Sequence, residues 1–145
     1  MKISTKGRYS LRFLLDLAQH KDDGFVSLKD VSERQNISKK YLEQIVPLLN
    51  KSGMLRANRG YQGGYMLAKP PEQCTVGDVL RLTEGSLAPV ACLDCEENTC
   101  ERRDECMTLP VWEGLNGVIT EYLDNISLQD IIDNYNGLAG NDYCI

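Results

Sequence analysis

Two serines, each standing directly before a short helical pattern, constrain the fold of this chain most. Ser27 precedes an amphipathic stretch over residues 28–35, and Ser38 precedes a second one, "KKYLEQIVPLLNKSG", which ends at Gly53. A serine in this position caps a helix by accepting a hydrogen bond from an amide of the first turn, and glycine often follows the last turn. Two short helices joined by a tight turn are typical of a helix-turn-helix motif. Apolar residues at helical spacing over residues 5–20 predict a further helix in front of the pair.

A glycine-rich hairpin follows the second of these helices. Over residues 54–67, apolar residues at both ends enclose the tip "RGYQGG", which is typical of two short strands joined by a turn. Gly60 permits a positive φ and a close approach of the backbone to a phosphate. We therefore expect a mainly α fold with a small β-wing, that is, a winged helix-turn-helix domain over residues 1–71.

A long helix is expected in the back half of the chain. Residues 72–107 comprise a short linker helix capped by Thr75 and a cysteine-rich loop, and residues 108–133 comprise a helix from Val111 to about residue 125 and a short terminal helix. Residues 134–145 are expected to form a flexible tail. An apolar stripe at spacings of four, three and four indicates a long C-terminal dimerization helix, and the alternative is a helix that faces the core of its own chain. The stripe consists of Val111, Leu115, Val118 and Tyr122.

Charge is divided unevenly along the chain. The net charge is −5, but residues 1–69 carry 13 Lys and Arg against 6 Asp and Glu, and the remainder carries 3 against 15. A basic front half favours an anionic partner such as double-stranded DNA, with a solvated basic face as the alternative. The sequence has no N-terminal apolar run and no stretch of about 18 apolar residues. We therefore expect a cytoplasmic protein that does not bind membranes.

The start of the second helix of the motif is the expected DNA-reading surface, because this helix enters the major groove with its N-terminal residues at the base edges. Gln44 can pair with adenine, Glu43 can accept a hydrogen bond from cytosine, and lysines suit phosphates. Arg59 at the wing tip suits the backbone or the minor groove. The candidate DNA-binding residues are Lys2, Arg8, Ser38, Lys39, Lys40, Tyr41, Glu43, Gln44, Arg59 and Gly60, with Lys6 as a further phosphate contact.

Four cysteines, Cys92, Cys95, Cys100 and Cys106, fall within the single segment "CLDCEENTCERRDEC". In the cytosol such a cluster is more often metal-binding or redox-active than a disulfide framework. Thiolates ligate iron–sulfur clusters and also zinc. The ligand set stays open between all four cysteines and triads that begin at Cys92 or at Cys95. The alternatives to an iron–sulfur cluster are a structural Zn²⁺, a thiol–disulfide switch and inert thiols.

Several segments of the chain resemble one known family. "MKISTKGRYSLRFLLDLA", "VSERQNISKKYLEQIV" and "RGYQGGYMLAKPP" resemble the opening, recognition helix and wing of the IscR-type winged-helix transcriptional regulators. The cysteine segment, with "LPVWEGLNGVI" and "YLDNISLQDI" after it, resembles their cluster loop and dimerization helix. The resemblance implies a homodimeric bacterial repressor of iron–sulfur cluster biogenesis genes that binds a pseudo-palindromic operator. It also implies control by a [2Fe–2S] or [4Fe–4S] cluster, and it places Ser38, Tyr41, Glu43, Gln44 and Arg59 at the DNA surface.

The chain departs from the family's pattern at one ligand position. The [2Fe–2S] members carry a histidine three residues after the last loop cysteine, where this chain has Leu109, and the single histidine here is His20. A fourth ligand could be Cys92, Asp94 or Glu96, or could come from the other subunit.

Two other functions remain as alternatives. Some members of the family lack the cysteines and regulate cysteine metabolism with a partner enzyme, so a cluster-free regulator of the same fold is one of them. The other is a small redox enzyme that uses the CxxC pair of the loop. We expect no enzymatic activity, because no βαβ pattern precedes this pair and no catalytic set of side chains is evident. Cys74 and Cys144 lie outside the loop and are expected to be a packed residue and a tail residue.

Overall fold

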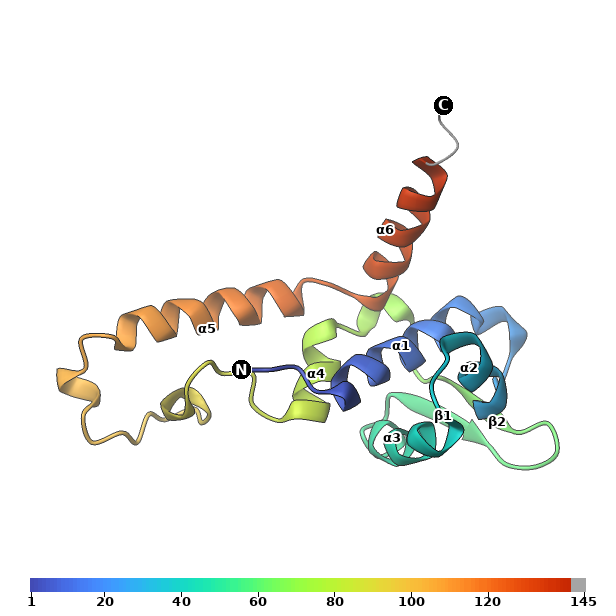
Figure 1. Ribbon diagram of the computed structural model, residues 1–145, viewed down its shortest axis with the longest axis horizontal. Coiled ribbons are helices and arrows are strands. Elements are labelled where there is room, and N and C mark those ends of the chain that lie inside the picture. The colour runs from blue at the N-terminus through green and yellow to red at the C-terminus, as the bar shows by residue number, and fades with distance from the viewer. Residues whose placement is uncertain (142–145) are drawn as a thin grey trace.

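The computed structural model describes residues 1–141, which form six α-helices and one two-stranded sheet (Figure 1). This arrangement confirms the predicted fold class, a mainly α winged helix with a long helix behind it. None of the described helices is long and apolar enough to cross a membrane. The elements are α1 Thr5–Gln19, α2 Leu28–Gln35, α3 Lys39–Lys51, β1 Leu55–Asn58, β2 Gly64–Leu67, α4 Val76–Glu84, α5 Leu109–Asp124 and α6 Leu128–Asn141.

Side-chain caps begin the helices where the sequence predicted them. Ser27 and Ser38 each accept a hydrogen bond at 3.1 Å from the amide three residues ahead, at the starts of α2 and α3. Thr75 begins α4 with a capping box, in which its hydroxyl and the Asp78 carboxylate each accept from the other residue's amide. Asn36 ends α2 in the left-handed conformation, with a φ of 51°. The turn from α2 into α3 is therefore as tight as a helix-turn-helix requires.

The main core lies between α1, α2, α3 and the root of the wing. Each fully buried apolar side chain of this core contributes roughly 1.5–3 kcal/mol to the stability of the fold. Leu128, the first residue of α6, is also fully buried there, so the back half is anchored in the same core as the DNA-binding part. The fully buried apolar side chains of the front half are Phe13, Leu14, Leu17, Val31, Leu42, Ile45 and Leu49.

The wing is an antiparallel hairpin that is fastened at its root. Leu55 pairs with Leu67, and Asn58 pairs with Gly64. Val26, which precedes α2, exchanges two backbone hydrogen bonds of 2.8 Å with Tyr65. This bridge ties the hairpin to the helix-turn-helix.

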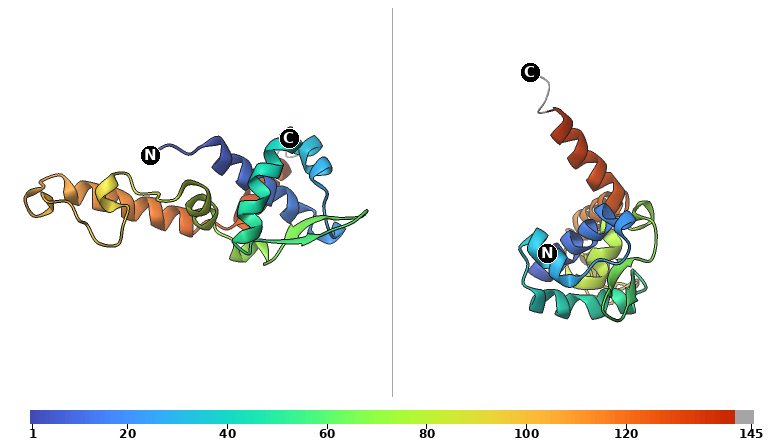
Figure 2. Two further views of the ribbon diagram at one scale, coloured as in Figure 1. Left: turned by 90° about the horizontal axis from the view of Figure 1, so that it is seen from below. Right: turned by 90° about the vertical axis from the view of Figure 1, so that its right-hand side faces the viewer.

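One side of α5 packs against α4, and the other side is exposed. Ile119 and Leu123 of α5 pack against a small cluster that contains Val76 and Leu80 of α4. The predicted stripe lies outside this contact, and α5 reaches well beyond the winged helix (Figures 1 and 2). The alternative that the stripe faces the core of its own chain is therefore wrong. The exposed fractions are 60% for Val111, 42% for Leu115, 64% for Val118 and 66% for Tyr122.

The last helix is longer than predicted. Residues 134–145 were predicted to form a flexible tail, but α6 continues to Asn141. Tyr135 and Leu138 extend its apolar pattern by another turn, and this periodicity outweighs the low helix propensity of the two glycines in the same stretch. The predicted tail position of Cys144 lies outside the described residues.

Candidate nucleic-acid interface and cysteine loop

The first two turns of α3 carry an exposed polar face opposite a buried apolar one. Leu42, Ile45, Val46 and Leu49 are buried against the core. Lys39, Lys40, Glu43 and Gln44 are exposed on the other side, next to the exposed cap Ser38. Lys39 and Glu43 form a surface ion pair at 4.0 Å, which is too exposed to hold either side chain firmly. The structure therefore brings these five predicted residues together on one accessible surface.

Tyr41 differs from the other predicted contacts because it is half-buried. Its ring meets the ring of Tyr9 edge to face, with centroids 5.4 Å apart, and the Arg12 guanidinium lies 5.3 Å from the Tyr9 centroid. Such contacts add to the attraction between helices. Tyr41 thus holds the first turn of α3 against α1, and only part of its side chain is available to DNA.

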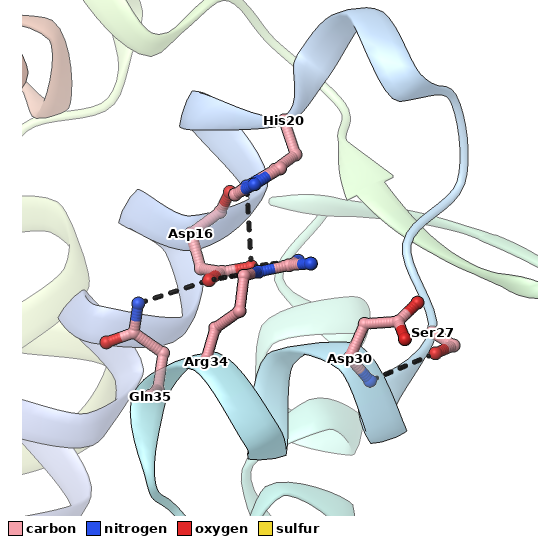
Figure 3. A network of polar contacts seen from close by, with 6 residues as sticks. All are labelled: Asp16, His20, Ser27, Asp30, Arg34 and Gln35. Carbon is pink, nitrogen blue, oxygen red and sulfur yellow. Dashed lines mark hydrogen bonds and ion pairs between the residues drawn. The ribbon is translucent and has the colours of Figure 1, made fainter.

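A buried carboxylate joins α1 to the end of α2 (Figure 3). Asp16 is 1% exposed, and its oxygens accept from Arg34 at 2.7 and 3.0 Å and from Gln35 at 3.1 Å. The hydrogen bond to Asp16 raises the pKa of Arg34 above its ordinary value. The His20 ring lies 2.8 Å from the Asp16 carbonyl oxygen. Arg12 adds a hydrogen bond from its guanidinium to the Gln35 carbonyl oxygen.

This network determines the position of the turn that precedes the recognition helix, because Arg34 and Gln35 are the last two residues of α2. The network was not predicted from the sequence. The available signal was an acidic residue, Asp16, within the apolar pattern of α1. A buried charge of this kind needs a partner.

The wing tip and the start of α1 add positive charge near α3. Arg59 and Gly60 are exposed, and Gly60 has a φ of 122°, which favours glycine at the tip. Lys2 and Arg8 are exposed at the start of α1. The wing hairpin and α3 lie along the same edge of the domain in both directions of view (Figures 1 and 2). The candidate interface therefore combines a polar recognition helix with a basic tip.

The four loop cysteines are spread over a segment that contains two short turns. Cys92 is half-buried in the turn Ala91–Leu93, Cys95 and Cys100 are exposed, and Cys106 is half-buried after the turn Arg103–Glu105. All four are free thiols. Within residues 1–141, the structure brings no three cysteine, histidine or acidic side chains close enough to share a metal ion. The loop thus presents its thiols individually.

Cys106 has the most favourable surroundings for a thiolate. Its sulfur lies 3.5 Å from the Thr108 hydroxyl, and this hydrogen bond is the main cause that lowers the pKa of Cys106. The residue also stands just before the N-terminus of α5, where the helix dipole favours negative charge. The donor chemistry of the loop therefore fits a thiolate-bound metal group, although its ligands would have to be gathered as the group binds.

Two further residues of metal-ligating type, Cys74 and His20, lie away from the cysteine loop. Cys74 is 4% exposed in the main core, and burial raises the pKa of its thiol. His20 belongs to the Asp16 network, at the end of the winged helix remote from the cysteine loop (Figures 1 and 3). The prediction that Cys74 is a packed residue is confirmed.

A winged helix with an exposed polar recognition helix and a basic wing, followed by a long helix with an open apolar face, defines a DNA-binding transcription regulator. The chain belongs to the Rrf2 family, described as "Iron-dependent Transcriptional regulator", whose profile matches residues 3–134. It is 39% identical to the HTH-type transcriptional regulator IscR of Pectobacterium atrosepticum over 134 residues, which are 92% of this chain and 80% of that protein. It is 40% identical to a putative HTH-type transcriptional regulator of Haemophilus influenzae, over 94% of this chain and 89% of that protein.

Solved structures agree with this assignment. IscR of T. potens is 41% identical and has a TM-score of 0.74, over 93% of this chain and 88% of that one. CymR, the global cysteine regulator of B. subtilis, is 36% identical and has a TM-score of 0.75, over 92% and 98%. The resemblance to IscR-type regulators is therefore confirmed. Because the relatives are named as transcriptional regulators, the chain is a regulator rather than a small redox enzyme.

Proposed function

We propose that this chain is a homodimeric repressor of bacterial iron–sulfur cluster biogenesis genes, and that an iron–sulfur cluster in the 92–106 loop controls its operator binding. The proposal rests on the direct connection of the cysteine loop to α5. The loop with the four thiols runs directly into α5, and α5 has an exposed apolar face along its length. A change in the loop therefore acts at the start of the helix that would join two subunits.

The dimer is supported by the stripe on α5. Val111, Leu115, Val118 and Tyr122 are large apolar side chains at the spacing of a packed helix pair, and each is at least 42% exposed. Contiguous exposed apolar surface of this kind marks an interaction site. A second copy of the same helix offers a matching surface, since a two-fold dimer pairs identical patches.

Operator binding is supported by the surface around α3. Ser38, Lys39, Lys40, Glu43 and Gln44 would read and position a major groove, and Arg59 with Gly60 would contact the backbone or minor groove. Lys2 and Arg8 would add phosphate contacts, and Tyr41 would contribute through its exposed part. Two such surfaces related by a two-fold axis would recognise a pseudo-palindrome.

The cluster is supported by the donor set. Cys92, Cys95, Cys100 and Cys106 are the residues that would hold it, as a [2Fe–2S] or [4Fe–4S] group. A bound cluster would supply a compact charged centre whose state depends on iron, sulfide and oxidants. Gathering these thiols around one group would compact the loop and move the start of α5, which would change the spacing of the two recognition helices.

A cluster-free or zinc-bound regulator is the second candidate. It is favoured by the likeness to CymR, the global cysteine regulator of B. subtilis. In that case the loop would hold a Zn²⁺ or act through thiol oxidation, and sulfur metabolism would be the regulated process.

Anaerobic purification separates these candidates. The visible absorption spectrum together with iron, sulfide and zinc analysis distinguishes a cluster, a zinc site and bare thiols. Binding to duplex DNA is then measured for the protein with and without its metal group. Equal affinity and the same footprint for both forms would contradict control by the cluster.

A further inference from the structure

Tyr61 is an exposed aromatic residue at the tip of the wing. Its exposed fraction is 104%, so its ring makes no lasting contact with the rest of the chain. The other large apolar side chains exposed among residues 1–141 are Met1, Met107 and residues of α5 and α6. Tyr61 is therefore the one such side chain between residues 2 and 71, and it stands two residues after Arg59.

The turn that carries this ring is well fixed. The Gly63 amide donates to the Gly60 carbonyl oxygen at 2.9 Å, which closes the tip. A Cβ on Gly63 would lie 2.5 Å from the Asn58 carbonyl oxygen, so the turn is packed backbone against backbone. The root of the hairpin is held by the double hydrogen bond between Val26 and Tyr65. The fixed backbone places Tyr61 at the end of the tip, and its uncontacted ring is free to rotate about its side-chain bonds to fit a groove.

The tip matches the minor groove in size and chemistry. The wing lies along the same edge of the domain as α3, so a duplex read by α3 in its major groove presents an adjacent minor groove to the tip (Figures 1 and 2). That groove is about 6 Å wide, with apolar deoxyribose walls and a floor of adenine N3 and thymine O2 acceptors. A phenol ring can pack on a wall while its hydroxyl donates to the floor, and Arg59 supplies the charge that a narrow groove attracts.

We propose that Tyr61 is a specificity-determining DNA contact, which enters the minor groove beside the α3 site and favours A·T over G·C there. The discrimination arises because the guanine N2 amino group projects from the groove floor and blocks the approach of the phenol hydroxyl to the N3 and O2 acceptors. The inference rests on the proposed operator binding. The proposed Tyr61 contact is apolar and directional, whereas the other residues of the DNA-binding surface are mostly charged.

The experiment uses the full-length protein and a labelled duplex obtained by in vitro selection with it, with the wing position located by hydroxyl-radical footprinting. Tyr61→Ala is expected to weaken binding about tenfold, as for the loss of one aromatic contact to DNA. The slope of affinity against salt stays unchanged, because no phosphate contact is lost. Arg59→Ala is the matched comparison, since it lowers the salt slope by about one. Tyr61→Phe keeps the ring and loses only the A·T preference.

Base substitution tests the groove directly. Changing the A·T pairs under the wing to G·C should weaken the wild type and leave Tyr61→Ala unaffected. Changing them to inosine·C, which lacks the N2 amino group, should restore wild-type binding. If Tyr61→Ala binds as tightly as the wild type, or loses affinity equally on all three duplexes, the inference is overturned. A wild type without salt-dependent binding to any selected duplex would instead overturn the proposed operator binding.

Discussion

The Glu84 carboxylate, at the end of α4, accepts two hydrogen bonds from Ser4, one from its hydroxyl at 2.6 Å and one from its amide at 3.2 Å. Ser4 is also the cap of α1, because its hydroxyl accepts from the Gly7 amide. A Cβ on Gly7 would meet the Glu84 carboxylate, so glycine lets the two helices approach. Since the chain leaves α4 directly after Glu84 and continues toward the cysteine loop, this contact joins the end of α4 to the start of α1.

We expect Glu84→Ala to lower the free energy of unfolding by about 1–2 kcal/mol, because two hydrogen bonds to a charged acceptor are lost. Urea unfolding measures this change. Hydrogen exchange of the amides near Ser4 should become faster in the same variant. Glu72→Ala removes an exposed carboxylate and serves as the control, with a change within about 0.5 kcal/mol. Equal losses in the two variants would contradict the role assigned to Glu84.

Asp16→Asn is expected to lower the free energy of unfolding by about 2–3 kcal/mol, because the buried side chain that accepts from Arg34 and Gln35 loses its charge. Operator affinity should fall as well, since the end of α2 is no longer held in place for the turn into α3. Asp22→Asn is the control, because Asp22 is exposed in the turn after α1. Thermal unfolding and fluorescence anisotropy with labelled DNA measure the two effects. If Asp16→Asn is as stable as the wild type, the network adds nothing to the free energy of unfolding.

Val118→Glu is expected to convert the proposed dimer to a monomer, because it puts a charge in the middle of the apolar stripe of α5. Thr120→Glu adds the same charge at an exposed position of α5 outside the stripe, and it should leave the dimer intact. Sedimentation velocity distinguishes the two outcomes. A dimeric Val118→Glu protein would place the subunit interface elsewhere.

Thiol reactivity in the metal-free protein should follow burial and pKa. Cys74 is buried and its pKa is raised, so its alkylation should be slower than in the denatured chain and should need a higher pH. The pKa of Cys106 is lowered, so its thiolate forms, and its alkylation begins, at a lower pH than in the denatured chain. Timed alkylation with N-ethylmaleimide and peptide mass spectrometry gives each rate. If Cys74 and Cys106 are alkylated at the same rates in native and denatured protein, the environments assigned to both thiols are wrong.

Cys92→Ala should change the absorption spectrum and metal content of the anaerobic protein if Cys92 is a ligand. Cys74→Ala is the control, because Cys74 lies in the main core and should leave the spectrum unchanged. An unchanged spectrum in Cys92→Ala would assign the ligand role to Cys95, Cys100 and Cys106.

Local patterns in the sequence were sufficient for much of the fold. The caps Ser27, Ser38 and Thr75, together with the apolar spacing after each, correctly predicted α2, α3 and α4, because capping and helical periodicity act over a few residues. The glycine-rich tip likewise predicted the wing. The end of α6 was missed because glycines in a local pattern indicate a stop, whereas the apolar periodicity of the helix continues through them.

Long-range contacts were decided only by the tertiary structure. Asp16 meets Arg34 and Ser4 meets Glu84 across sequence distances that no local pattern encodes, because such pairs form when separate helices pack. The apolar spacing of the stripe on α5 fits packing against the core of its own chain and packing against a partner equally well. Burial resolves this ambiguity for the single chain: Ile119 and Leu123 take the inner face, and the stripe remains exposed.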